Sequence, residues 1–173
     1  TIEADENLLD IITTEVRGST LKIGTSEDIK DSEALNVYIT FKMIDDLEIS
    51  GACQVSSENK FKLGNLSLDC SGASDLTLKM SAGEIELDCS GASQVDLYGT
   101  GESMQLDLSG ASNMDASDFE VGICDADVSG ASHGKIMVKS ELSVDVSGAG
   151  SLKYSGDPVI KSHDVSGAGS LKK

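Results

Sequence analysis

The tripeptide Ser-Gly-Ala recurs seven times from residue 50 onward, and this repeat limits the possible folds more than any other feature. The copies begin at Ser50, Ser71, Ser90, Ser109, Ser129, Ser147 and Ser166. Successive copies start 21, 19, 19, 20, 18 and 19 residues apart. A near-constant period of this length is typical of solenoids, in which each repeat buries its apolar face against neighbouring repeats.

Apolar and polar residues alternate on both sides of each triplet. The residue directly before the serine is apolar in all seven copies: Ile49, Cys70, Cys89, Leu108, Val128, Val146 and Val165. Alternation with a period of two indicates strands with one buried face. The glycine between two such strands can adopt the backbone angles of a tight corner.

Antiparallel hairpins and parallel coils are the two arrangements that these strands allow. Every repeat has the same order of residues, so equivalent residues are expected to stack on one another, which parallel in-register pairing achieves. The sequence therefore predicts an all-β fold, a right-handed single-stranded parallel β-helix (a solenoid) with coils of about 19 residues. Each coil would rise by about 4.8 Å, the spacing of paired strands.

We expect residues 1–173 to form a single β-helix domain, in which residues 46–173 contribute the seven Ser-Gly-Ala coils. Residues 1–45 are predicted to form irregular N-terminal coils, with a short helix at Asp5–Ile12. Glu15–Gly24 is expected to form two strands joined by a turn at Arg17-Gly18.

The last coil differs from the others. Its interior positions become polar, at Lys161, His163 and Lys173, and Pro158, the one proline, lies in the loop just before this coil. These residues predict a C-terminal cap, because the end of a solenoid needs a polar outer face. A strand is also expected earlier in the chain, at Leu35–Phe41.

The chain carries 30 acidic and 13 basic residues, a net charge of −17. This charge argues against nucleic acid as a partner, because phosphate binding depends on lysine and arginine, and Arg17 is the one arginine. No stretch is long and apolar enough for direct insertion into a membrane, and no signal peptide is visible at Thr1. The sequence leaves the oligomeric state open.

An acidic residue stands two positions before the serine in every copy. These residues are Glu48, Asp69, Asp88, Asp107, Asp127, Asp145 and Asp164. Stacked coils would place the carboxylates in an outward column, which we name the acid column. One interpretation is structural, with each carboxylate accepting hydrogen bonds from the following corner. The other is a cation ladder in which Ca²⁺ bridges adjacent coils; no other cofactor is expected.

Catalytic residues are not expected, and we predict that the protein is not an enzyme. The acids are spread one per coil, whereas hydrolases and lyases gather them at one groove. His133 follows a corner at a position where other copies carry Asp, Gln, Asn or Ser, which favours a surface variant. Outward residues rich in Ser, Asn, Asp and Gln, such as Gln94 and Asn113, suit hydrogen bonding to sugars.

Cys70 and Cys89 occupy the same inward position in adjacent coils. Parallel in-register neighbours point their Cβ atoms in the same direction, which fits disulfide geometry poorly. A free cysteine packs as a small apolar residue. We therefore expect these two residues, together with Cys53 and Cys124, to be free thiols.

The repeated corner, as in Ile85-Glu-Leu-Asp-Cys-Ser-Gly-Ala-Ser93, resembles the family called putative auto-transporter adhesin, head GIN domain. The segments beginning at Ile2 and Val165 are also similar to that family. The resemblance implies a right-handed parallel β-helix in an extracytoplasmic protein of a Gram-negative bacterium, secreted, periplasmic or anchored to the outer membrane. It implies a non-catalytic adhesin that binds surface carbohydrate or protein along a β-face. The alternatives are a structural spacer or scaffold without a ligand, a lipid-binding module or a cation-binding module.

Overall fold

The structure is a computed structural model that describes residues 1–29 and 34–173. Internal contacts divide the chain into two compact units, Thr1–Lys42 and Met43–Lys173. The boundary lies close to residue 45, where the sequence changes from irregular to regular. That both units form a single domain stays a prediction.

The first unit contains antiparallel strand pairs where irregular coils were expected. Strand β1 (Ile2–Ala4) pairs with β4 (Leu35–Val37), and β2 (Ile12–Arg17) pairs with β3 (Thr20–Thr25). The tight turn between β2 and β3 was predicted, and it accounts for their direction, because a two-residue connection can join only antiparallel strands. Gly18 in this turn has a φ of 62°.

The helix predicted at Asp5–Ile12 is reduced to a single 3₁₀ turn, η1 (Glu6–Leu8). Asp5 precedes this turn, but its side chain does not cap it. Its Oδ1 atom instead accepts a hydrogen bond of 3.2 Å from the backbone N–H of Ala34. The strand expected at Leu35–Phe41 likewise ends early, at Val37.

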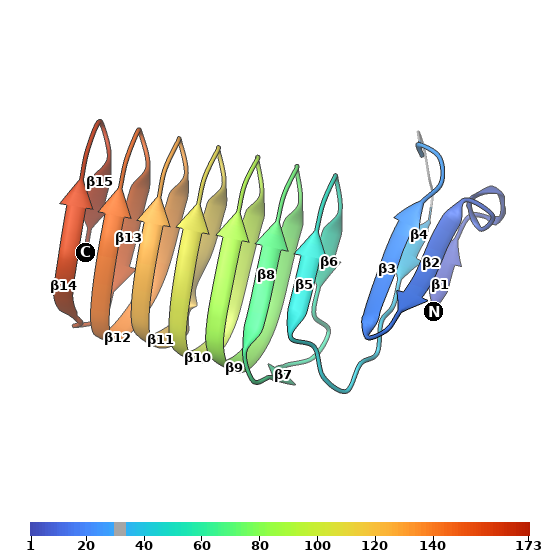
Figure 1. Ribbon diagram of the computed structural model, residues 1–173, viewed down its shortest axis with the longest axis horizontal. Helices are drawn as coiled ribbons and strands as arrows, with labels where there is room; N and C mark the ends of the chain where they lie inside the picture. Colours follow the sequence, from blue (N-terminus) through green and yellow to red (C-terminus); the bar gives the residue numbers. More distant parts are fainter. Residues whose placement is uncertain (30–33) are drawn as a thin grey trace. The chain divides into compact units, whose positions relative to one another are not determined.

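The second unit is a parallel β-solenoid of about seven turns, which confirms the predicted fold class (Figure 1). Its strands pair only in parallel within the described residues. They are β5 (Asp46–Ile49), β6 (Gln54–Ser56), β7 (Phe61–Lys62), β8 (Leu66–Cys70), β9 (Asp75–Cys89), β10 (Gln94–Leu108), β11 (Asn113–Val128), β12 (His133–Val146), β13 (Ser151–Ser155), β14 (Val159–Val165) and β15 (Ser170–Lys172).

Each central coil is one long strand, not the two short strands that the alternation suggested. Strands β9, β10, β11 and β12 contain 15, 15, 16 and 14 residues. Opposite the Ser-Gly-Ala corner the chain bends without interrupting the ladder, and Gly99 and Met80 remain paired there. The register shifts between the long strands also lie away from the corners. Coils of different length therefore differ by register shifts within the long strands, and the stacking of the corners is unchanged.

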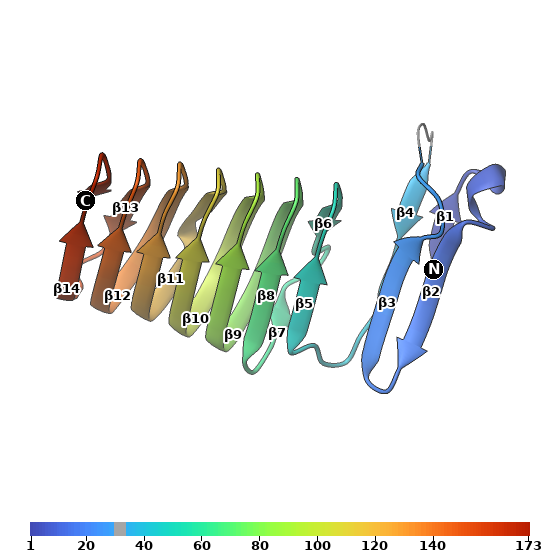
Figure 2. The ribbon, with the colours of Figure 1, turned by 45° about the horizontal axis from the view of Figure 1, so that its top comes forward.

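The corners stack directly on one another along one edge of the solenoid, as Figure 2 shows. The N–H of Ala92 donates to the carbonyl of Gly72 at 2.8 Å, and each later corner repeats this bond. The fourth corner residue closes the turn, for example through the hydroxyl of Ser112, which donates to the carbonyl of Ser109 at 2.9 Å. Backbone groups that a tight corner leaves unpaired thus find partners in the next coil or in the corner itself.

The core lies between the two faces of the flattened coils and follows the predicted inward positions. Of the seven residues directly before a corner serine, the first six are buried, from Ile49 to Val146. Burying one such aliphatic side chain stabilises the fold by roughly 1.5–3 kcal/mol. Phe119 is the one aromatic side chain among the described residues that is fully buried.

The last coil corrects the prediction that Lys161 lies in the interior. A register shift in β14 pairs Ile160 with Leu142 and Ser162 with Ser143, so Lys161 is left over between them. Its Nζ atom forms an ion pair of 3.1 Å with Glu141. A bulge of one residue moves a charged side chain out of an inward position, and every residue of β14 is exposed.

The stacked corners predict that Gly91→Ala is strongly destabilising. Gly91 has a φ of 79°, and a Cβ atom there would lie 2.5 Å from the carbonyl oxygen of Gly72. Left-handed strain alone costs about 1–3 kcal/mol, so we expect a loss of at least about 2 kcal/mol in urea unfolding. Gly64→Ala is the control, because a Cβ atom at Gly64 would meet no other atom within 4 Å and this residue lacks a positive φ. Equal midpoints for the two variants would contradict the stacked corners.

Candidate functional site

The acid column exists as predicted, with equivalent carboxylates in register on neighbouring strands. Glu48 pairs with Asp69, Asp69 with Asp88, and Asp88 with Asp107. The register continues through Asp127 and Asp145 to Asp164. All seven residues are exposed. Strand alternation explains their direction, because the residues on both sides of each aspartate from Asp69 to Asp145 are buried.

Hydrogen bonding from the corners does not neutralise the acid column. The hydroxyl of Ser71 donates to the carbonyl of Ile49 at 3.4 Å, and Ser109 donates to the carbonyl of Cys89 at 3.3 Å. Corner N–H groups likewise bind carbonyl groups of the preceding coil. Across residues 1–29 and 34–173, the seven carboxylates form no hydrogen bond or ion pair. The structural interpretation of the acid column is therefore wrong, because the corner N–H groups and the hydroxyls of Ser71, Ser109 and Ser129 donate to backbone carbonyls instead.

Burial and mutual repulsion raise the pKa of several of these carboxyl groups. Partial desolvation is the largest cause for Asp69, Asp107 and Asp127, and neighbouring carboxylates add to it. Asp88 acts on the first two, whereas Asp127 is affected first by Asp125 of the same strand and then by Asp145. The acid column thus opposes its own ionisation, as expected for like charges placed opposite one another on paired strands.

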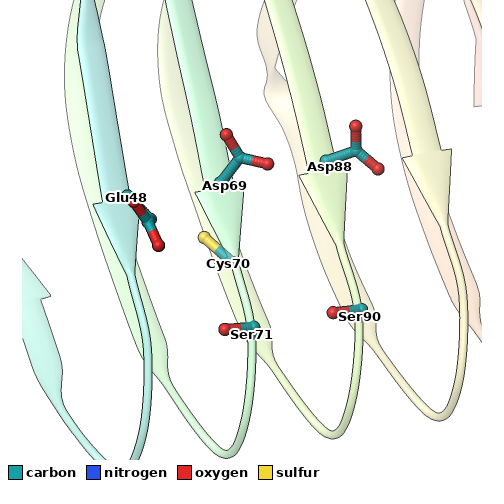
Figure 3. Close-up of a pocket in the computed structure, with 6 residues that line it drawn as sticks. All are labelled: Glu48, Asp69, Cys70, Ser71, Asp88 and Ser90. Carbon is teal, nitrogen blue, oxygen red and sulfur yellow. The ribbon is translucent and has the colours of Figure 1, made fainter.

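A shallow open depression lies over the first coils of the acid column (Figure 3). It is lined by Glu48, Asp69, Cys70, Ser71, Asp88 and Ser90. In the close-up, the carboxylates come from successive strands and do not converge on one point. No three His, Cys, Asp or Glu side chains of the described chain form a group that could hold a metal ion. The calcium ladder stays a prediction, without a preformed site to support it.

The opposite face is formed by the part of each coil that directly follows its corner, and we name it the face after the corners. It carries a second column that the sequence analysis missed. The residue six positions after each corner serine points outward: Ser56, Thr77, Asp96, Asp115, Lys135, Lys153 and Lys172. The first two residues of this column are uncharged, the next two are aspartates and the last three are lysines. The charge of the column therefore changes from negative to positive toward the C-terminus. Asp115 and Lys135 meet at the change and form an ion pair of 2.8 Å. The signal was present in the sequence, but it is a trend across the copies and not a repeated residue.

Asp115 shows how opposite charges act in this column. Desolvation raises the pKa of its carboxyl group, but hydrogen bonds from Lys135 and Ser117 outweigh that effect. The net result is a pKa below the ordinary value for aspartate. The same pairing raises the pKa of Lys135. The acid column has no such compensation within the described residues.

The side chains considered for nucleophilic or acid–base chemistry are held in structural roles. The Nδ1 atom of the exposed His133 lies 3.0 Å from the carbonyl oxygen of Ala131. Burial raises the pKa of the Cys124 thiol to about 12. A hydrogen bond to Cys70, together with burial, also raises the pKa of the Cys89 thiol. The same hydrogen bond lowers the pKa of the Cys70 thiol, but Cys70 is buried. A reactive thiol needs both a lowered pKa and an accessible position, and none of these three thiols has both.

The comparisons with known proteins agree with this architecture. A family model described as "putative auto-transporter adhesin, head GIN domain" matches residues 1–158. A solved structure of a putative adhesin from Bacteroides fragilis is 24% identical, with a TM-score of 0.89 over 96% of this chain and 78% of that one. A putative adhesin from Parabacteroides merdae is 18% identical, with a TM-score of 0.79 over 99% and 81% of the two chains.

A further solved structure has a different name. A putative lipid binding protein from Parabacteroides distasonis is 18% identical, with a TM-score of 0.61 over 99% of this chain and 82% of that one. At these identities the solved structures show the fold alone. No curated protein matches the chain. No helix in the described part of the chain has the length and hydropathy that a bilayer span requires.

The acid column predicts that the protein becomes more stable when the pH falls from neutral toward about 4. A carboxyl group with a raised pKa binds more protons in the folded state than in the unfolded state, so unfolding becomes harder as the pH falls through that pKa. Asp69, Asp107 and Asp127 act in this window. Asp115 and Asp157, whose pKa values are lowered, weaken the fold only below about pH 4.

Asp107→Asn tests the same effect at neutral pH. We expect a gain of about 0.2–1 kcal/mol, the usual range for cross-strand charge pairs, measured by urea unfolding at low salt. Asp75→Asn, on the other face, is the control. A loss of stability in Asp107→Asn would mean that the carboxylate has a favourable partner.

Millimolar calcium, compared with sodium chloride at equal ionic strength, should raise the melting temperature only if the cation ladder exists.

Proposed function

Because the chain belongs to the family described as "putative auto-transporter adhesin, head GIN domain", we propose that it is a non-catalytic adhesive module of the bacterial cell envelope. It binds surface carbohydrate or protein along an outward face of the solenoid. Its location is extracytoplasmic, as a secreted, periplasmic or outer-membrane-anchored protein. The family description supports adhesion and an extracytoplasmic location, and the flat outward faces of the stacked coils support binding along one of them.

The observation that carries this proposal is the composition of the face after the corners. Its outward residues include amides, hydroxyls and both signs of charge on neighbouring strands, such as Gln94, Asn113 and Lys135. Solenoids present such side chains as an extended binding surface. The face of the acid column is more uniform, and its negative charge would admit only cationic partners.

The packed interior argues against the alternative of lipid binding inside the solenoid. Leu68, Leu87 and Leu106 fill the same level of three successive coils and are at most 1% exposed. A core of this density leaves no room for an acyl chain, because voids in protein interiors are few and small. The distribution of the acids, one per coil, also supports a role without catalysis.

A glycan array and a panel of immobilised extracellular proteins test the proposal with the fluorescently labelled full chain. We expect reproducible binding with a Kd in the micromolar range to at least one ligand class. Asn113→Tyr with Ser151→Tyr should abolish this binding, because bulky rings would block the face after the corners. Gln105→Tyr with Ser143→Tyr places the same rings beside the acid column and should leave binding intact.

Two results would count against this function. Absence of any reproducible ligand for the folded protein would favour a structural spacer. Equal losses in both double variants, with unchanged melting temperatures, would move the binding surface away from the face after the corners.

A further inference from the structure

Three lysines follow one another in register on the face after the corners. Lys135 on β12 pairs with Lys153 on β13, which pairs with Lys172 on β15. All three are exposed. Paired strands are about 4.8 Å apart, so their ammonium groups form a short row across the strands. We name this row the lysine column.

The lysine column is only partly neutralised by the protein itself. Lys135 has Asp115 as its partner at 2.8 Å. Neither Lys153 nor Lys172 forms an ion pair with any described residue. Like charges directly opposite on paired strands are destabilising. An anionic ligand that bridges these ammonium groups would remove that cost.

Two of the three lysines of the lysine column, Lys153 and Lys172, lie in a basic segment of an acidic chain. Residues 1–150 contain nine basic and 28 acidic residues, a net charge of −19. Residues 151–173 contain four basic and two acidic residues, a net charge of +2. Outside this end, an anion meets carboxylates such as Asp96 and Asp115 in the same column. The location at which an anion can bind is therefore defined by the sequence of the last coils.

The surroundings of the lysine column fit a sugar better than a lipid surface. The neighbouring outward residues on the same strands are His133, Ser151 and Ser170, which offer hydrogen-bonding groups. A bilayer would approach as a broad plane and would also meet the acidic coils, whose charge repels anionic headgroups. A single extended chain can follow the column and avoid the acidic coils.

We propose that the lysine column binds the carboxylates of a linear acidic polysaccharide, such as a polymer of uronic acids, running across the strands. This inference rests on the proposed adhesive function and names the ligand class of its binding face. Lys153 and Lys172 pair with carboxylates on successive sugars, whose repeat is comparable to one strand spacing. Ser151 and Ser170 donate to sugar oxygens. The binding region ends at Lys135, because Asp115 already neutralises that lysine.

Titration of the full chain with polygalacturonate, followed by isothermal calorimetry, tests this inference. At about 0.15 M salt, acidic residues more than about 8 Å from the lysine column are screened. We expect Lys153→Gln with Lys172→Gln to weaken binding by roughly tenfold, the combined effect of two exposed ion pairs. The control is Lys139→Gln with Lys161→Gln, which removes the same charge from lysines paired with Glu120 and Glu141. It should change binding by less than about twofold.

The outcomes separate this inference from the proposed function. Binding of neutral glycans or proteins without any binding of polygalacturonate would overturn the acidic ligand and leave the adhesive function standing. Equal weakening in both double variants would overturn the lysine column as the binding site. Binding to phosphatidylglycerol vesicles, but not to the polymer, would replace the polysaccharide with a membrane surface. Polymer binding lost only in Lys153→Gln with Lys172→Gln would establish the inference.

Discussion

The backbone hydrogen bond between equivalent residues of successive coils is the interaction on which the rest of the structure depends. At the corners it joins Ala92 to Gly72 at 2.8 Å, and each later alanine to the glycine one coil earlier. Ordering one coil of about 19 residues costs roughly 1–2 kcal/mol per residue. One coil's buried side chains do not offset this cost, so a coil is stable only when its neighbours supply backbone partners.

In-register stacking also explains why charges form columns. A position that points outward in one coil points outward in the next, so a repeated aspartate becomes a row of repelling carboxylates. Partial desolvation raises the pKa of Asp69, Asp107 and Asp127, and repulsion between carboxylates adds to it. We expect the acid column to cost stability at neutral pH, because like charges placed opposite one another on paired strands repel. The backbone hydrogen bonds of the corners form without the carboxylates, so the coils stack despite this repulsion.

The repeat predicted the solenoid, the inward positions and the acid column, because each depends on a residue type that recurs at a fixed interval. It did not predict the partners of the corner hydroxyls, which depend on the distance between coils and not on sequence spacing. The bulge at Lys161 was missed because the pattern counts residues and cannot show where one is left out of the ladder. Residues 1–45 lack the repeat, so only the turn at Gly18 was a reliable local signal there.

The lysine column was missed for a different reason, which bears on where function lies in such a fold. A repeat consists of residues that are alike in every coil. Those residues are the corner glycines and the inward apolar side chains, which stack on their equivalents in the next coil. The outward side chains of the face after the corners take no part in the backbone hydrogen bonds between coils. These residues can therefore differ from coil to coil without loss of stability. The change from Asp115 to Lys135 and Lys153 is such a difference. The proposed binding of an acidic polysaccharide therefore depends on positions where the repeat is broken, because these positions distinguish one coil from the next.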